Sequence, residues 1–456
     1  MPRMGLFPGT VRRSRGDLPQ LPLVNMYAET AITEPTQFAL QSRPGLVSSG
    51  TSYGAGPIRA LYKADGVLSG YTVALSGSSL YVNGVSVGTV NGTGSPSIAG
   101  NQMGVVVTRG SDANYYDGSD FRNISFPDSA SVVKVMEQGG RFVFIRGDTQ
   151  RYYWTQPLAN AVDGSGDILI DGLDYTSAEN EPDKLVDGLV FENHLVLGGV
   201  SSIEFHGQTG NDDAPWQPTL GRVFNKGVRA AGCMTLWNNS FAWVSPGNIV
   251  YQYAGSAPAR ISDDGIEELI AASTACSTDS FFLEGHEFLR IKLDDVDLLC
   301  DAVTGEWCQW ATYNQTGFVG GPVLTGPQFG STIDGTIYNL TENDELGTTM
   351  ERYFRAGFPL EAGNMTVHNL ALRANPGQGA SALTVSMRYS RDGGQTWTNY
   401  VSVSLGDAGE YRTLAEWRAL GLFDQPGALF DFKFTGDAQF RCSGVVYNES
   451  MRGRSR

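Results

Sequence analysis

Short apolar runs recur along the chain, and each is followed by a turn and a second β-rich run. Six of them stand out: TVAL at 72–75, MGVVV at 103–107, RFVFI at 141–145, NHLVLG at 193–198, NSFAWV at 239–244 and EFLRIKL at 287–293. Polar and apolar residues alternate poorly within them, which is typical of strands covered on both faces. The pattern therefore predicts short, buried β-strands joined by tight turns.

The second run of each unit ends near an aromatic or apolar residue, and this signature occurs seven times. Its positions are Tyr81, Tyr116, Tyr153, Phe205, Tyr251, Cys300 and Tyr338, spaced 35, 37, 52, 46, 49 and 38 residues apart. The spacing is close to the roughly 40–50 residues of a four-stranded propeller blade. We therefore expect a seven-bladed β-propeller over residues 51–345. Consecutive β-sandwiches are the alternative, because divergent β repeats are easily over-read.

The regions on either side of the predicted propeller have different patterns. Residues 1–50 show no clean periodicity and are predicted to be an extended arm that lends a strand elsewhere. After residue 345 the signature disappears, and the runs TVHNLALRA, ALTVSMRYSRDG, TNYVSVSL, ALFDFKFTG and AQFRCSGVVYN alternate as antiparallel strands do. These runs predict an antiparallel β-sandwich over residues 346–448, followed by a basic tail at 449–456.

Helix signals are scarce, so we expect an all-β protein with few short helices. In ISDDGIEELIAAST, Ser262 or Asp263 can cap a helix whose apolar residues share one face. A capping box at Thr413–Glu416 predicts a second short helix that stops at Gly421. The alternative for this second segment is a connector that packs Trp417 and Leu420 onto a core.

Charge is distributed unevenly along the chain. The total of 32 basic and 48 acidic residues gives −16, yet the first fifteen residues carry Arg3, Arg12, Arg13 and Arg15 and no acid. Such ends often order on a partner, so these four arginines are a candidate docking arm, with solvated termini as the alternative. Of the 32 bases, 26 are arginines, which favours protein interfaces. An acidic body argues against a groove that grips nucleic acid.

One motif in the predicted sandwich has a specific match. SRDGGQTW at 390–397 is a complete Asp-box, with Ser390, Asp392, Gly394, Thr396 and Trp397. We interpret it as a structural β-hairpin whose Ser and Asp side chains bond the backbone and whose Trp packs beneath the turn. A sialidase would need several such boxes within its propeller, an arginine cluster and a Tyr/Glu pair, so we expect no catalytic residues.

No pattern indicates a metal or cofactor site. The acids Asp163, Asp167, Asp171 and Asp174 resemble a calcium loop, but Ile168 stands where an EF-hand needs glycine. The four histidines are scattered, and the chain has no Gly-rich phosphate loop or nucleophile elbow. The five cysteines, an odd number without a CxxC pair, are expected to be reduced and buried, as in a protein made in the cytosol. Consistent with that compartment, the N-terminus lacks the apolar stretch of a secretory signal, and no run is long enough for a transmembrane helix.

Several segments occur in the order found in one family. They are LPLVNMYAE (21–29), SRPGL (42–46), GSSLYVNGVSVGTVNGTG (77–94), SAENEPDKLVDGLVFENHLVLGGVSSIEFHGQTGN (177–211), FNKGVRAAGC (224–233), ISDDGIEELI (261–270), EGHEFLRIKL (284–293), GEWCQW (305–310) and EWRALGLF (416–423). In this order the chain resembles the tail-hub, or nozzle, proteins of short-tailed bacteriophages, also called packaged-DNA stabilisation proteins.

The resemblance implies a structural virion protein made in the host cytoplasm. It implies a homohexameric ring below the portal and adaptor, with tail needle, plug or fibre proteins beneath it. The ring would retain packaged DNA and conduct it during ejection without specific DNA binding. Two other functions remain open: a propeller-based glycan-active enzyme of the sialidase or depolymerase kind, and a receptor-binding tail module.

Overall fold

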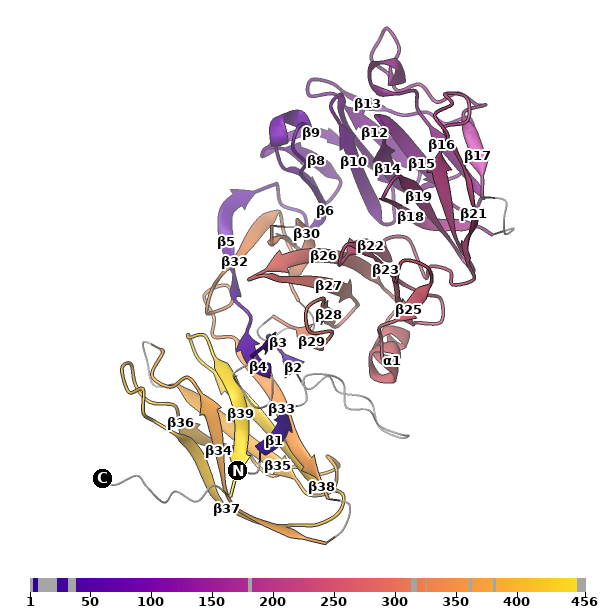
Figure 1. Cartoon of the computed structure of the whole chain (residues 1–456). Helices are drawn as coiled ribbons and strands as arrows, with labels where there is room; N and C mark the ends of the chain where they lie inside the picture. Colours follow the sequence, from indigo (N-terminus) through magenta and orange to yellow (C-terminus); the bar gives the residue numbers. More distant parts are fainter. Residues whose placement is uncertain are drawn as a thin grey trace.

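The computed structural model describes residues 3–6, 23–31, 38–178, 183–312, 318–324, 326–360, 363–379 and 383–448. Seven antiparallel units of four strands fill the first part of this chain (Figure 1), six of them as separate sheets and one as part of a larger sheet that continues into the C-terminal domain. In chain order, the first three are β6 (Ile58–Tyr62), β7 (Val73–Ser76), β8 (Ser79–Val82), β9 (Val85–Thr89); β10 (Pro96–Asn101), β11 (Gly104–Arg109), β12 (Asp112–Tyr116), β13 (Phe121–Asn123); and β14 (Val132–Gln138), β15 (Arg141–Arg146), β16 (Arg151–Trp154), β17 (Tyr175–Ser177).

The other four units of four strands complete the propeller. They are β18 (Leu185–Phe191), β19 (His194–Gly199), β20 (Ile203–Gln208), β21 (Trp216–Phe224); β22 (Met234–Trp237), β23 (Ser240–Val244), β24 (Val250–Tyr253), β25 (Pro258–Arg260); β26 (Ser277–Leu283), β27 (His286–Lys292), β28 (Asp297–Asp301), β29 (Trp307–Trp310); and β30 (Gly320–Leu324), β31 (Gln328–Ser331), β32 (Thr336–Glu342), β5 (Gly45–Ser52). The prediction of a seven-bladed propeller is confirmed.

The ring closes through the first strand of each blade. Each first strand contacts the first strand of the next blade, in the order β6, β10, β14, β18, β22, β26 and β30. The contact of β30 with β6 closes the ring. The seventh blade takes its outer strand, β5, from the N-terminal side of the propeller, antiparallel to β32. All seven signature residues found in the sequence lie in the third strand of their blade.

Stacking of the blades explains why the second strands do not alternate in polarity. All six residues of β15 are buried. Phe142 and Phe144 pack with blade 2, whereas Val143 and Ile145 pack with blade 4. Because a strand in a middle blade is covered on both faces, its apolar residues run consecutively.

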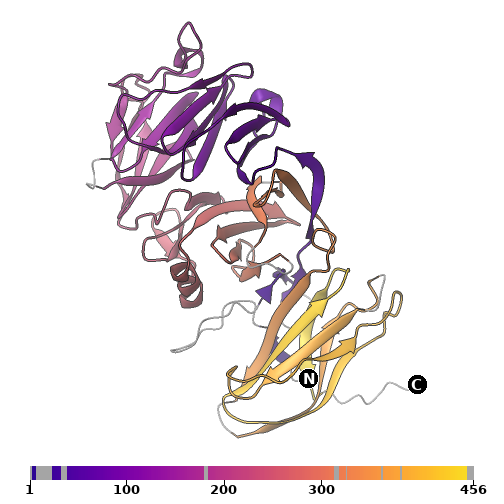
Figure 2. The same ribbon diagram turned by 180° about the vertical axis from the view of Figure 1, so that it is seen from behind.

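The C-terminal part is a β-sandwich with an aromatic core (Figure 2). One sheet holds β33 (Glu351–Pro359), β38 (Gly427–Thr435), β35 (Thr384–Ser390) and β36 (Val401–Ser404). The other holds β39 (Arg441–Tyr447), β34 (Met365–Ala374) and β37 (Ala415–Phe423). Phe354 and Phe432 stack at 4.9 Å between ring centroids, and Phe434 and Phe440 at 4.5 Å.

One helix prediction is wrong and one is confirmed. The segment after the capping box at Thr413–Glu416 forms strand β37, because pairing with β34 supplies a full ladder of hydrogen bonds and buries Trp417 and Leu420. Positive φ at Ala419 (59°) and Gly421 (92°) produces the irregular register there. The predicted helix after Asp263 is α1 (Asp264–Ala272), with the Asp263 side chain accepting from the Ile266 amide at 2.9 Å.

The described N-terminal segments join the two domains. β1 (Arg3–Leu6) pairs with both β33 and β39 and so links the two sheets of the sandwich. β2 (Leu23–Val24) lies between β29 of blade 6 and β33 of the sandwich. β3 (Met26–Thr30) and β4 (Phe38–Ser42) form a hairpin, and β4 pairs with β39 of the sandwich. In Figure 1 these indigo strands lie among the yellow and orange ones.

Candidate functional site: propeller axis and domain junction

A cavity of about 610 Å³ lies on the propeller axis. Its wall comes from the first strands β6, β10, β14, β26 and β30, together with Gly232 just before β22. Six of the seven blades therefore contribute to it. Its volume is that of a small-molecule pocket, which is typically about 300–1,000 Å³.

Two cations beside this cavity are paired with carboxylates. The Arg290 guanidinium is fully buried and donates to Asp279 at 2.8 Å and to the Gly320 carbonyl at 3.0 Å. Lys292 Nζ lies 3.3 Å from Asp297 Oδ1 and 3.0 Å from the Phe318 carbonyl oxygen. Burial lowers the pKa of Lys292, although Asp297 opposes this, and burial raises the pKa of Asp297. Each of these two cations has carboxylate and carbonyl partners, and Arg59 and Lys134 also line the cavity.

A second buried pair holds the N-terminal strands against the propeller. Arg43 and Glu345 are 0% and 1% exposed, and two parallel hydrogen bonds of 2.8 and 3.0 Å connect them. The other Arg43 donors reach Asn25 Oδ1 (2.9 Å) and the carbonyls of Pro44 (2.8 Å) and Ala311 (3.0 Å). All five N–H groups of the guanidinium are thus satisfied.

The carboxylate of this pair is saturated as well. Glu345 Oε2 also accepts from the Leu46 amide at 3.1 Å, and Oε1 accepts from the Thr312 hydroxyl at 3.4 Å. Trp310 and Phe318 cover the guanidinium, with ring centroids 5.1 and 5.0 Å from Arg43 Cζ. The pair therefore fixes four distant chain segments where blades 6 and 7 meet the N-terminal strands.

A second buried arginine lies close to the junction. Arg352 is 0% exposed and donates to the carbonyls of Met350 (3.2 Å), Gly436 (2.9 Å) and Asn343. Burial and, to a smaller extent, the nearby Arg43 lower its pKa to about 10, while Glu345 acts in the opposite direction. Glu345 therefore acts on two buried guanidinium groups.

The Asp-box forms a hairpin on the outer face of the sandwich. Asp392 accepts from the Thr396 amide (2.9 Å) and hydroxyl (2.6 Å), and Ser390 Oγ accepts from the Gly394 amide (2.8 Å). These bonds hold the pKa of Asp392 well below its usual range. Trp397 lies over two arginines, with its ring 4.9 Å from Arg355 Cζ and 4.8 Å from Arg388 Cζ.

The two arginines beneath Trp397 share one buried carboxylate. Arg355 Nε donates to Asp431 Oδ1 at 2.7 Å, and Arg388 Nε donates to Asp431 Oδ2 at 3.1 Å. Asp431 is 0% exposed. The functional groups of the motif are thus engaged with one another and with the sheet below.

The remaining candidate residues fall in different places. Arg12, Arg13, Arg15 and the tail 449–456 lie outside the described residues, whereas Arg3 begins β1. Asp163 caps its own loop by accepting from the amides of Ser165 (2.8 Å) and Asp167 (3.0 Å). Within the described ranges no group of three His, Cys, Asp or Glu side chains is arranged to hold a metal ion.

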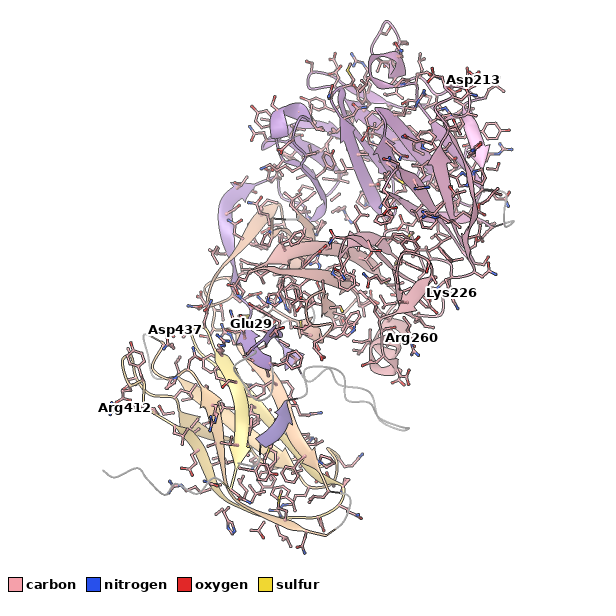
Figure 3. The ribbon with its side chains drawn as sticks, in the orientation of Figure 1. Glu29, Asp213, Lys226, Arg260, Arg412 and Asp437 are labelled. Carbon is pink, nitrogen blue, oxygen red and sulfur yellow. The ribbon has the colours of Figure 1, made fainter. Side chains whose placement is uncertain are left out.

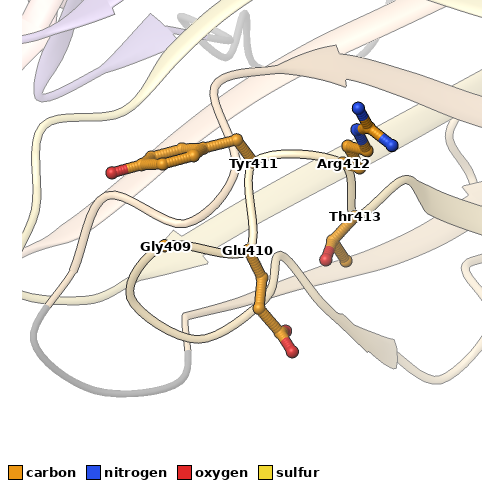
Figure 4. Close-up of a pocket in the computed structure, with 5 residues that line it drawn as sticks. All are labelled: Gly409, Glu410, Tyr411, Arg412 and Thr413. Carbon is orange, nitrogen blue, oxygen red and sulfur yellow. The ribbon is translucent and has the colours of Figure 1, made fainter.

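Another hollow, of about 480 Å³, lies at the loop 409–413 between β36 and β37 (Figure 4). The side chains of Glu410, Tyr411 and Arg412 diverge from this loop instead of converging on a common point. Tyr411 is 67% exposed. Figure 3 places Arg412 and Asp437 on the sandwich and Glu29 at its boundary with the propeller, where Arg441 pairs with Glu29 at 3.4 Å. Among the described residues, no helix has the length and apolar character needed to cross a membrane.

Acidity is concentrated in one domain. Residues 51–345 contain 35 acids and 15 bases, a net charge of −20, whereas residues 346–448 contain nine of each. The propeller therefore repels polyanions, and the sandwich is neutral.

Two family models match the chain. One, described as bacteriophage P22 Gp10, beta-propeller, matches residues 3–322, and the other, described as bacteriophage P22 Gp10, beta-sandwich, matches residues 351–447. Among curated protein sequences none matches.

Similar solved structures have low scores. BBS1N in complex with ARL6DN is 8% identical with a TM-score of 0.40, covering 66% of this chain and 99% of that one. PorZ of Porphyromonas gingivalis is 11% identical with a TM-score of 0.37, covering 78% and 46%. BamB from Moraxella catarrhalis is 9% identical with a TM-score of 0.35, covering 65% and 96%. Scores this low carry no argument about function.

Proposed function

The chain belongs to the bacteriophage P22 Gp10 family of phage tail structural proteins, and from this membership we propose that it forms the tail hub, or nozzle, of the virion. In this role it continues the portal–adaptor channel, retains the packaged DNA and conducts it during ejection. The observation that carries the proposal is the family match to both domains, over residues 3–322 and 351–447.

A DNA channel in this protein has to lie between subunits. The axial cavity of one propeller measures about 610 Å³, and its wall carries buried, paired charges. A DNA duplex, whose major groove alone is about 12 Å wide, cannot thread it. Conducting DNA therefore requires a closed ring of several copies around a common axis. We propose six copies, as the family resemblance implies.

The charge of the propeller supports passage without binding. Each favourable phosphate contact releases counterions and would retard moving DNA. A domain with 35 acids and 15 bases makes few such contacts, so we propose that the propellers face the channel. A cryo-EM structure of the assembled ring with a predominantly basic lumen would refute this assignment.

We also propose neighbours for each end. The adaptor and portal dock above the ring, tail needle, plug or fibre proteins dock below, and the subunit is made in the host cytoplasm before assembly. Arg3, Arg12, Arg13 and Arg15 form the docking arm. Because Arg3 begins β1, deleting residues 1–15 would also remove a strand of the sandwich. Replacing Arg12, Arg13 and Arg15 by Ser tests docking while leaving β1 in place, and normal docking of that variant would remove the arm from the proposal.

The role requires no catalysis. The Asp-box, the one motif shared with sialidases, uses its Ser and Asp groups to hold its own turn. Hydrolysis of host polysaccharide by the purified protein would favour a glycan-active enzyme, and adsorption to cells that blocks infection would favour a receptor-binding module.

The proposal is tested by negative-stain electron microscopy of the purified protein, alone and mixed with portal–adaptor complexes. We expect six-fold rings with a central channel, docked coaxially on the adaptor. Monomers that never assemble on the adaptor would contradict the proposal.

A further inference from the structure

Two cysteines meet where blade 5 adjoins blade 6. Cys233 immediately precedes β22, and Cys276 immediately precedes β26. The Thr278 amide donates to the Gly232 carbonyl at 2.7 Å, which holds the two chain segments side by side. The Cys233 thiol donates to the Cys276 carbonyl oxygen at 3.2 Å. Two cysteines from different blades therefore adjoin each other.

The two thiols differ in access. Cys233 is 0% exposed, whereas Cys276 is partly exposed at the edge of the same apolar cluster. The neighbouring Cys233 thiol lowers the pKa of Cys276, although burial opposes this. A partly accessible thiol with a lowered pKa is the one that reacts first, since the thiolate is the nucleophile.

We propose that Cys233 and Cys276 are a redox modification site, at which an intramolecular disulfide forms when the chain meets a small-molecule disulfide such as oxidised glutathione. The bond would fasten blade 5 to blade 6 beside the axial cavity, to which Gly232 and Ser277 contribute. This inference concerns the folded chain and does not depend on its role in the virion.

The reaction is a pair of thiol–disulfide exchanges. Cys276 Sγ attacks one sulfur of oxidised glutathione, the glutathione S–S bond breaks, and the leaving thiolate takes up a proton. Cys233 Sγ then attacks Cys276 Sγ and releases the second glutathione as its thiol. The protein loses two protons and two electrons, and one oxidised glutathione becomes two reduced molecules.

The chain contains a matched pair that is not expected to react. Cys300 and Cys308 lie on the neighbouring strands β28 and β29, where Cys300 pairs with Trp307 and Cys308 with Leu299. Their side chains consequently point to opposite faces of the sheet, and they belong to different apolar clusters. Proximity in sequence would favour a disulfide between Cys300 and Cys308, whereas the contact in the folded chain favours one between Cys233 and Cys276.

The test uses the full-length protein incubated with oxidised glutathione, followed by denaturation, alkylation of free thiols and mass spectrometry. We expect the wild type to lose two of its five thiols, to recover them with dithiothreitol, and to yield a linked pair of peptides containing Cys233 and Cys276. Five alkylated cysteines, or a link that includes Cys300, Cys308 or Cys442, would overturn the proposal.

Three variants assign the two sulfurs. C300S should still lose two thiols. C233S should carry glutathione on Cys276 without forming an intramolecular link, and C276S, which changes the partly exposed position, should keep all four thiols. Loss of two thiols in C276S would overturn the proposal even if C233S failed to fold.

Discussion

Replacing Arg43 by Met tests how much one buried ion pair contributes to the packing of the N-terminal strands against the propeller. The change removes both hydrogen bonds to Glu345 and leaves a carboxylate that is 1% exposed without its counter-charge. Removing one partner of a buried pair costs about 3–5 kcal/mol, because the remaining charge stays desolvated. The aliphatic part of Met still fills the space between Trp310 and Phe318, so lost packing contributes little. We expect R43M to lower the free energy of unfolding by about 3–5 kcal/mol.

The measurement is urea unfolding at 25 °C, followed by tryptophan fluorescence and far-ultraviolet circular dichroism, whose coincidence checks for a single transition. The matched control is R418M, which removes a 2.8 Å pair with Glu416 from an Arg418 side chain that is 74% exposed, and which should cost far less than R43M because the pair is screened by water. The double variant R43M/E345M should cost less than the sum of its single variants, because no lone charge remains. If R43M does not fold, R43K keeps the charge but not the paired geometry and should be intermediate. Equal losses in R43M and R418M would refute the reasoning.

Three further measurements test other parts of the molecule. The pKa of His286 is raised by its 2.9 Å hydrogen bond to Asp301, and Glu29 and Glu284 add to the effect. Protonated His286 therefore stabilises the fold fully below its unfolded pKa of about 6.5, and this stabilisation is lost as the pH rises through the higher folded pKa. The stability difference between wild type and H286Q should therefore shrink from pH 6 to pH 9, and a constant difference would contradict this assignment. W397A removes the ring over Arg355 and Arg388 and should lower the free energy of unfolding by about 1–3 kcal/mol, while an unchanged free energy of unfolding would show that these contacts contribute nothing. Oxidation of Cys233 and Cys276 closes a 44-residue loop and should stabilise the propeller by up to about 4 kcal/mol, an effect that C276S must abolish.

The blades could be predicted from the sequence because each of them must bury both faces of its sheet, and so each has a similar pattern of apolar residues. A four-stranded sheet in a ring is covered on both faces, so its second strand carries a run of consecutive buried apolar residues, as in β15 and β19. Its third strand carries the aromatic or apolar residue that gave the seven-fold count. Such local patterns need no knowledge of which blade is the neighbour.

The segment 413–421 shows where local pattern fails. A capping box predicts a helix when the first turn can bury its apolar residues along one side. Here β34 offers a complete edge for pairing, and a bulge at Ala419 and Gly421 lets Trp417 and Leu420 both face the core. Tertiary pairing therefore outweighed the local signal, which is common for short segments.

The contacts that hold the architecture together are invisible in the sequence for a different reason. Arg43 and Glu345 are 302 residues apart, and Cys233 and Cys276 lie in different blades. A buried ion pair of this kind is weak evidence for stability, because apolar residues of similar volume are often as good. The pair is better evidence for specificity of packing. The hydrogen-bonding groups of Arg43 and Glu345 are all satisfied only when Asn25, Ala311 and Leu46 are in their native positions. The junction thus specifies how the N-terminal strands enter the ring. A rigid connection of this kind is needed if the propeller and the sandwich of one subunit must keep a single relative orientation within a larger assembly.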